Sequence, residues 1–113
     1  MSNKIITVDG VPTLQVEDPK SLNEYTLIDV RRTDEFNAEL GHISGAKLAT
    51  LGEELNSYLS QADKNKKILF ICRSGMRSAN ATLAAQALGF KEVYNMQGGM
   101  MGWNNNNFPI TRD

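Results

Sequence analysis

The sequence is short of cysteine and histidine, with one of each among 113 residues, and it has no long hydrophobic run. A single cysteine cannot form an internal disulfide, the staple that small secreted domains need, so a reducing compartment and hence the cytoplasm are expected. One histidine and one cysteine cannot complete a zinc site, so we expect no metal and no other cofactor. No apolar stretch approaches the roughly 18 residues of a membrane span, and the apolar start at residues 5–8 is too short for a signal peptide.

An excess of charge of one sign is also missing. The chain has 12 basic and 13 acidic residues, for a formal net charge of -1. Nucleic-acid-binding domains carry clustered positive charge, so we expect neither a nucleic-acid partner nor a membrane partner. What is present is the balance of an ordinary globular protein, with 41% hydrophobic and 22% charged residues. The length predicts a single domain over residues 1–113. The sequence does not indicate the oligomeric state, and a monomer is assumed.

Short runs of β-forming residues predict the strands. They lie at residues 5–8, 13–16, 26–30, 68–71 and 93–95. The runs at 26–30 and 68–71 are compact and apolar, which is typical of strands buried on both faces of a sheet. Asp9-Gly10 and Pro12 are turn signals that separate the first two runs.

Helical patterns alternate with these strands. They cover residues 33–40, 51–59 and 78–88. Thr33 or Asp34 is expected to cap the first helix, which Gly41 ends, and Gly89 is expected to end the third. Polar residues predict solvated loops at 63–67 and 104–107. This alternation favours βαβ units and a parallel sheet.

The single cysteine, Cys72, directly follows the predicted strand 68–71. In open α/β sheets, functional groups gather at the carboxyl ends of the strands. A lone cysteine can also be a small buried hydrophobe. This one, however, is followed by a turn containing Gly75, by a helix start and by two arginines, Arg73 and Arg77. Because a helix N-terminus and nearby positive charge both stabilise a thiolate, the pattern favours a nucleophilic Cys72.

The residues after the cysteine offer hydrogen-bond donors. With Gly75 in a positive-φ conformation, the amides of residues 73–78 can turn inward as an anion-binding nest, although an ordinary tight turn also explains this glycine. Arg77 can bind substrate or a bracing carboxylate, and Arg73 can select anionic substrates at the pocket mouth. A solvated surface charge is the alternative for either arginine.

Two serines and a methionine complete this loop. Ser74 and Ser78 add hydroxyl donors, with a helix cap as the alternative role of Ser78. Met76 is apolar and indicates little about the acceptor. No second cysteine exists to resolve a disulfide, so an internal dithiol redox cycle is excluded and any covalent chemistry belongs to Cys72.

Four segments carry a family resemblance. They are "LIDVRRTDEF" at residues 27–36, "GHISGA" at 41–46, "CRSGMRS" at 72–78 and "NMQGGMMGW" at 95–103. In order and spacing they resemble the signatures of the rhodanese-like sulfurtransferases, over most of the chain from Leu27 to Trp103. Ser44 stands where that family commonly has proline, which loosens the turn but touches no proposed chemistry.

The resemblance implies a central parallel sheet with helices on both faces. It implies that Cys72 accepts sulfane sulfur as a persulfide and passes it to a thiophilic acceptor, while the amides of residues 73–78 hold the charged persulfide. It also implies supporting residues near one strand end and in the turn that follows. These are Asp29, Arg31, Glu35 and His42.

The supporting residues also have simpler explanations. Asp29 can cap or turn the chain at its strand end, and Arg31 and Glu35 can form an exposed i, i+4 pair worth tenths of a kcal/mol. His42 can serve as a general base in principle, but the loop itself favours the thiolate, so we expect a structural His42. Core packing is expected for a last apolar cluster, with the rim of an acceptor pocket as the alternative. This cluster comprises Met96, Met100, Met101 and Trp103.

The leading hypothesis is an enzyme of the thiosulfate:cyanide sulfurtransferase type. It moves sulfur from thiosulfate or a persulfide donor to cyanide, a thiol or a protein acceptor through a Cys72 persulfide. One alternative is a module that carries sulfur or binds a partner without turnover. Another is a cysteine phosphatase or arsenate reductase, but the C-x4-R spacing from Cys72 to Arg77 is one residue shorter than the loop of those enzymes. The smaller cradle favours a terminal sulfur over a phosphate.

Overall fold

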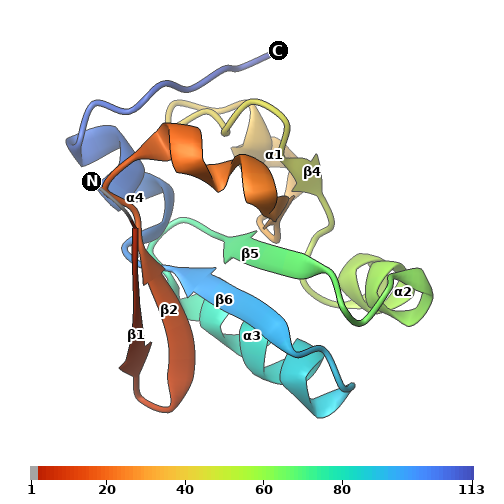
Figure 1. Ribbon diagram of the computed structural model, residues 1–113. Coiled ribbons are helices and arrows are strands. Elements are labelled where there is room, and N and C mark those ends of the chain that lie inside the picture. Colours follow the sequence, from red (N-terminus) through yellow and green to blue (C-terminus); the bar gives the residue numbers. More distant parts are fainter. Residues whose placement is uncertain (1–2) are drawn as a thin grey trace.

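The computed structural model describes residues 3–113, which fold around a six-stranded sheet (Figure 1). The strands are β1 (Lys4–Val8), β2 (Val11–Gln15), β3 (Thr26–Asp29), β4 (Lys47–Leu48), β5 (Lys67–Ile71) and β6 (Glu92–Met96). Their order across the sheet is β1-β2-β6-β5-β3-β4. β1 pairs antiparallel with β2, whereas the other neighbouring strands pair in parallel. The predicted parallel sheet is therefore confirmed, with one antiparallel strand added at its edge.

Helices cover both faces of this sheet (Figure 1). They are the 3-10 helix η1 (Pro19–Glu24) and the α-helices α1 (Thr33–Phe36), α2 (Glu53–Gln61), α3 (Met76–Ala87) and α4 (Gly99–Asn105). Buried residues of α2 and α3 belong to one hydrophobic cluster, and those of η1 and α4 belong to a second cluster. The helices on both faces that the family resemblance implies are thus present.

The central strand β5 links the two clusters. Successive side chains of a strand point to opposite faces. Accordingly, Ile68 and Phe70 pack under α2 and α3, while Leu69 and Ile71 pack under η1 and α4. All four side chains are fully buried. Burial on both faces explains why this strand is a continuous hydrophobic run.

The N-terminal hairpin differs from its prediction at Pro12. Asp9 and Gly10 form the turn, with φ of 51° and 79°. Pro12 lies inside β2, opposite Thr7 of the edge strand β1, rather than in a turn. Because β6 pairs with β2 only at positions 13 and 14, the missing amide hydrogen of Pro12 interrupts no bond to the sheet interior.

The helix predicted over residues 33–40 is only α1, Thr33–Phe36. Arg32 occupies its N-cap position, and the Arg32 amide donates to the Glu35 carboxylate at 3.0 Å. Neither Thr33 nor Asp34 caps it, so this part of the prediction was wrong. The carboxylate of Glu35, the third residue of the helix, accepts from the N-cap amide and replaces the short polar cap that we predicted.

The third helix starts two residues earlier than predicted. α3 begins at Met76, with Gly75 at the N-cap position in a left-handed conformation, φ 109° and ψ -8°. Ser78, for which a helix cap was the alternative to a hydroxyl donor, lies within the first turn and is not the cap. The predicted end of the helix is confirmed, because Gly89 has φ 99° and its amide donates to the Gln86 carbonyl at 2.9 Å.

Two other helix boundaries were also misplaced. Leu51 lies outside α2, which starts at Glu53, and its amide donates to the carbonyl of Val30 beside the sheet. Asn104 and Asn105 belong to α4 rather than to a polar loop. The Leu51 amide contacts Val30, and Asn104 Nδ2 donates to the Leu40 carbonyl at 3.1 Å. Both contacts join distant parts of the chain, which a local pattern does not contain.

Three elements had no sequence prediction: η1, β4 and α4. The start of η1 is capped by Asp18, whose carboxylate accepts from the Lys20 amide at 3.0 Å. α4 follows Gly98 and begins at Gly99, both with positive φ. Among the helices of residues 3–113, none is long and apolar enough to cross a membrane.

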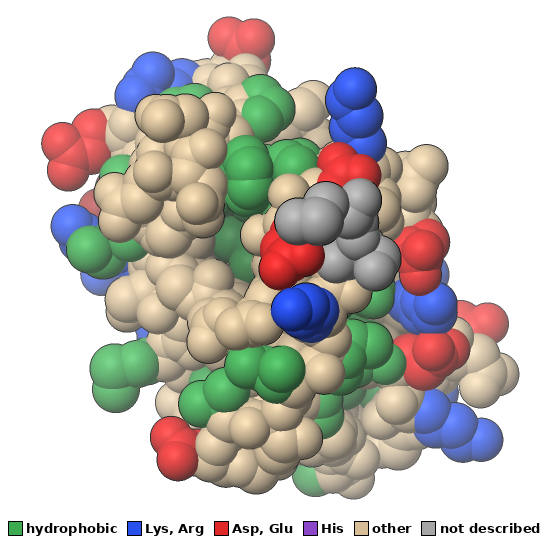
Figure 2. Space-filling model, turned by 60° about the vertical axis from the view of Figure 1, so that its left-hand side comes forward, with side chains coloured by type: hydrophobic (Ala, Val, Ile, Leu, Met, Phe, Trp, Pro, Cys, Tyr) green, Lys and Arg blue, Asp and Glu red, His purple; other side chains and the backbone are tan. Residues whose placement is uncertain are grey.

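Charged side chains of both signs are interspersed on the face shown in Figure 2. An ion pair joins Lys67 at the start of β5 to Glu24 at the end of η1, with 2.8 Å between Nζ and Oε1. The mixed surface agrees with the formal net charge of -1.

Candidate active site

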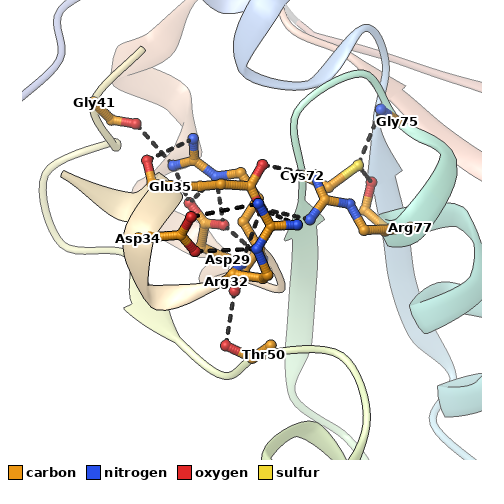
Figure 3. A network of polar contacts seen from close by, with 11 residues as sticks. Asp29, Arg32, Asp34, Glu35, Gly41, Thr50, Cys72, Gly75 and Arg77 are labelled. Atoms are coloured by element: carbon orange, nitrogen blue, oxygen red, sulfur yellow. Dashed lines mark hydrogen bonds and ion pairs between the residues drawn. The ribbon is translucent and has the colours of Figure 1, made fainter. Parts of the chain in front are cut away.

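Cys72 lies at the carboxyl end of β5, where the chain turns into α3 (Figure 3). The amide of Gly75 donates to Cys72 Sγ at 3.0 Å. This bond depends on the positive φ of Gly75, 109°, a conformation that side chains with a Cβ disfavour. Sequence reasoning proposed that several amides of residues 73–78 face the sulfur. In the described structure, the amide of Gly75 is the one that reaches it.

The Cys72 side chain is buried, and the residue is only 1% exposed. It packs in the cluster under α2 and α3, as expected for a small hydrophobe, while its sulfur faces a polar donor. Both interpretations of the lone cysteine therefore describe part of its environment. The sulfur is enclosed by the loop and faces the amide of Gly75.

The start of α4 donates two backbone hydrogen bonds to the cysteine loop. The amide of Met100 donates to the Cys72 carbonyl at 2.8 Å, and the amide of Met101 donates to the Arg73 carbonyl at 2.9 Å. Gly99 makes this approach possible, because a Cβ there would lie 2.6 Å from the Cys72 carbonyl oxygen. Gly99 of the last signature segment thus allows close backbone packing against the cysteine loop.

Ser78 and Asn95 form a polar pair beside the sulfur. The Ser78 hydroxyl lies 3.2 Å from Cys72 Sγ and 2.5 Å from Asn95 Oδ1. Asn95 also donates from Nδ2 to the Gly75 carbonyl at 3.0 Å. Sequence reasoning missed Asn95. Its position at the end of β6, paired with Phe70 of β5, was the available signal, because polar residues at neighbouring strand ends converge.

Asp29 and Arg31 form a buried ion pair, with side chains 0% and 1% exposed. Arg31 donates from Nε and Nη2 to the two carboxylate oxygens, at 2.9 and 2.7 Å. Its Nη2 also donates to the carbonyl of Gly41 at 2.7 Å, and its Nη1 to that of Glu35. These two contacts fix the backbone at Glu35 in α1 and at Gly41 in the segment that follows. Arg31 is therefore not half of an exposed i, i+4 pair.

Glu35 instead pairs with Arg77 of α3 (Figure 3). Arg77 donates to both carboxylate oxygens, at 2.6 and 2.9 Å. These hydrogen bonds are the main cause that lowers the pKa of Glu35 from 4.5 to about 2, and the amide of Arg32 adds to the effect. The same bonds raise the pKa of Arg77, with a smaller contribution from attraction to the Cys72 sulfur.

The outer part of the loop faces solvent. Arg73, Ser74 and Met76 are exposed, and Met76 is 78% exposed. Arg73 lines a cavity of about 220 Å³ together with residues of α1 and of the segments on either side of it, including Arg32 and Glu39. The cavity carries acidic and basic groups together, so its lining does not select anions by charge alone.

His42 packs against α1 rather than beside the cysteine loop. Its ring stacks on Phe36, with centroids 3.7 Å apart, and its Nδ1 lies 3.0 Å from the Phe36 carbonyl. The backbone of His42 forms an isolated bridge with Thr111. Each of these contacts is structural in kind.

The apolar residues after the last strand divide between core and surface. Met96, Met100 and Trp103 are buried in the cluster that covers one face of the sheet. Met101 is 43% exposed, so the prediction of core packing was wrong for this residue. Within residues 3–113, no group of three or more potential metal-ligating side chains is gathered in one place.

Both the sequence and the structure of this chain are similar to those of known proteins. The family model described as Rhodanese-like domain matches residues 13–106. Thiosulfate sulfurtransferase 18 of Arabidopsis thaliana is 32% identical, with 93% of this chain and 87% of the relative covered. Thiosulfate sulfurtransferase GlpE of Shewanella oneidensis is also 32% identical, with 83% and 87% covered. The crystal structure of a rhodanese-related protein from Thermoplasma volcanium superposes with a TM-score of 0.78 at 25% identity, covering 89% of this chain and 98% of that one.

Proposed function

The chain belongs to the rhodanese-like domain family, and we propose that it is a sulfurtransferase whose Cys72 carries the transferred sulfur as a persulfide. The observation that carries the proposal is the position of Cys72 Sγ at a strand end, 3.0 Å from the amide of Gly75 at the N-cap position of α3. Relatives named thiosulfate sulfurtransferase support sulfur-transfer chemistry for the family.

The first half-reaction loads the enzyme. The thiolate of Cys72 attacks the outer sulfur of thiosulfate, a bond forms between Sγ and that sulfur, and the S–S bond of thiosulfate breaks. Sulfite leaves with the bonding electron pair, so the negative charge of the enzyme moves from Sγ to the terminal sulfur. A persulfide donor reacts in the same way and releases a thiolate.

The second half-reaction unloads it. The carbon of cyanide, or the sulfur of a thiol or protein acceptor, attacks the terminal sulfur of the persulfide. The bond between Sγ and the terminal sulfur breaks, and its electron pair regenerates the Cys72 thiolate. With cyanide the product is thiocyanate. No cofactor enters either step.

The loop residues have separate tasks in this scheme. Gly75 donates to the sulfur, and Arg77 supplies positive charge while Glu35 fixes its position. Arg73, Ser74 and Met76 form the outer wall, and since Cys72 is 1% exposed, a donor reaches Sγ when this wall shifts.

The supporting residues act on the scaffold. Asp29 and Arg31 hold the turn after β3, and His42 packs on α1, so none of the three touches the reacting sulfur in this scheme. We also propose that the protein works in the cytoplasm, because a lone reactive thiol needs a reducing compartment. Its partners are then small sulfur donors together with thiol, cyanide or protein acceptors.

The proposal is tested by incubating wild type and Cys72→Ala with thiosulfate and cyanide and measuring thiocyanate. We expect turnover in wild type and background rates in the variant, with a mass gain of one sulfur atom on wild type before cyanide is added. Equal rates in the two proteins would rule out Cys72 as the sulfur carrier. A stable persulfide with no turnover on any acceptor would reassign the protein as a sulfur carrier, and hydrolysis of an aryl phosphate would reassign it as a phosphatase.

A further inference from the structure

Asn95 connects β6 to the cysteine loop through two hydrogen bonds of opposite direction. Its Nδ2 donates to the Gly75 carbonyl at 3.0 Å, and its Oδ1 lies 2.5 Å from the Ser78 hydroxyl. A carbonyl oxygen only accepts hydrogen bonds, so the atom that faces Gly75 is the amide nitrogen, and the orientation of the Asn95 amide is fixed. Oδ1, which only accepts, therefore faces Ser78.

The Ser78 hydroxyl has one hydrogen and two acceptors within reach. Asn95 Oδ1 lies at 2.5 Å and Cys72 Sγ at 3.2 Å. Ser78 is fully buried and Asn95 is 8% exposed, so both groups depend on partners within the protein. When Sγ is neutral, the nearer oxygen takes the hydrogen, and a lone pair of the Ser78 oxygen is left to accept from the thiol S–H. When Sγ is anionic, the charged sulfur becomes the better acceptor.

We propose that Asn95 is a positioning residue that acts through Ser78. It holds the Ser78 hydroxyl whenever Cys72 Sγ is uncharged and yields it to Sγ when the sulfur is a thiolate. Asn95 thus provides a second acceptor for a buried donor whose other acceptor within reach, the uncharged sulfur, accepts only weakly. The same residue holds the Gly75 carbonyl, so the turn that presents the Gly75 amide stays in place while the hydroxyl rotates.

The purpose of this switch rests on the proposed sulfur transfer. As Sγ bonds to the incoming sulfur and the donor S–S bond breaks, the negative charge leaves Sγ and comes to lie on the terminal sulfur. Ser78 then has no charged partner at Sγ, and its hydroxyl returns to Asn95 Oδ1. When an acceptor removes the terminal sulfur, the thiolate forms again and the hydroxyl rotates back. The hydroxyl is thus hydrogen-bonded before and after each half-reaction.

Infrared spectroscopy tests the neutral state without any sulfur donor. The chain has one cysteine, so its S–H stretching band reports Cys72 alone. In acidic buffer we expect wild type to show the lowered frequency of an S–H group that donates a hydrogen bond. Ser78→Ala removes the acceptor, and Asn95→Leu turns the Ser78 hydrogen toward sulfur, so both variants shift the band to higher frequency. Asn80→Leu, the same substitution at an exposed position of α3, leaves it unchanged. An unbonded S–H frequency in wild type, or no shift in Ser78→Ala, overturns the proposal.

Alkylation of Cys72 by iodoacetamide tests the coupling between the two residues. At a pH where the thiolate is the minor form, the rate follows the thiolate population. We expect Asn95→Leu to raise the rate and Ser78→Ala to lower it, each by about three- to tenfold, the range of one hydrogen bond. In the Ser78→Ala background, Asn95→Leu has no further effect, because the hydroxyl it acts through is gone.

A purely structural Asn95 gives a different result. If the residue only clamps the loop through Gly75, Asn95→Leu exposes the sulfur and raises alkylation equally with and without Ser78, which overturns the proposal. Neither measurement requires sulfur transfer. A protein that fails to produce thiocyanate but shows the band shifts and the coupling disproves the proposed function and leaves the switch intact.

Discussion

Arg77 donates two hydrogen bonds to the Glu35 carboxylate, at 2.6 and 2.9 Å, joining residues that lie 42 positions apart. A bidentate pair of this kind fixes the orientation of both side chains as well as adding stability. Arg77 belongs both to the cysteine loop and to the first turn of α3, and Glu35 belongs to α1. The pair therefore links the start of α3, beside Cys72, to α1.

The first prediction concerns pH and Glu35. Its pKa is lowered from 4.5 to about 2 in the folded protein, chiefly by the hydrogen bonds from Arg77. A depressed folded-state pKa stabilises the fold above the unfolded value, and that contribution is lost as pH falls from about 4.5 toward 2. Denaturant unfolding of wild type across this window should show the loss, and Glu35→Gln should show a flatter profile. Parallel profiles for the two proteins would contradict this assignment.

The second prediction concerns the buried Arg31. Arg31→Met leaves the Asp29 carboxylate buried without its partner, so the free energy of unfolding should fall by about 3–5 kcal/mol. The matched control is Arg32→Met, because the Arg32 side chain is 66% exposed and its pair with Asp34 lies at the surface. That change should leave the free energy of unfolding nearly unchanged, because a solvent-exposed ion pair adds little stability. Equal losses for the two variants in urea titrations would show that burial of Arg31 is not the cause.

The third prediction concerns the contact between α4 and the cysteine loop. A Cβ on Gly99 would lie 2.5 Å from the Arg73 carbonyl oxygen, and φ at Gly99 is 57°. Gly99→Ala should therefore displace the loop, lower stability and slow sulfur transfer. Gly45→Ala is the control, since Gly45 also has a positive φ but nothing within 4 Å of its added Cβ. That variant should lose only the backbone cost of about 1–2 kcal/mol and keep its transfer rate. A Gly99→Ala protein as stable and active as Gly45→Ala would contradict the close contact.

The fourth prediction separates structure from catalysis at His42. Its ring stacks on Phe36 at 3.7 Å between centroids and is buried. His42→Gln removes the stacked ring, so the thermal midpoint should fall by the equivalent of about 1 kcal/mol. The rate of thiocyanate formation per folded molecule should stay within about twofold, because the ring has no place in the proposed steps. A large loss of rate with unchanged stability would instead indicate a general base.

Local patterns predicted most of the sheet. The run Ile68–Ile71 is hydrophobic at every position, and such a run requires burial on both faces. Gly89 ended its helix as predicted, because positive φ at that position favours glycine whatever surrounds it. Helix starts were predicted less well. At α1, the cap comes from Glu35 inside the helix, and at α3 it is replaced by the turn at Gly75.

The candidate site was predicted in its centre and only partly at its edges. Cys72 and Gly75 are local features of one turn, and their contact follows from the chain geometry between them. Glu35 was first considered with Arg31, its neighbour at i, i+4 spacing, yet its partner is Arg77. Asn95 was missed altogether, because its role depends on β6 lying next to β5.

The sequence by itself determined where five of the six strands run, where the single thiol follows a strand, and which glycine makes the turn beside it. These features depend on hydrophobic periodicity and backbone preference, which act over a few residues. Only the tertiary structure decided that Arg31 is buried with Asp29, that Glu35 meets Arg77, and that the Ser78 hydroxyl lies between a sulfur and an amide 17 positions further along the chain. Strand order and helix docking bring such groups together. Their charges and hydrogen bonds are then satisfied by whichever partners burial leaves within reach.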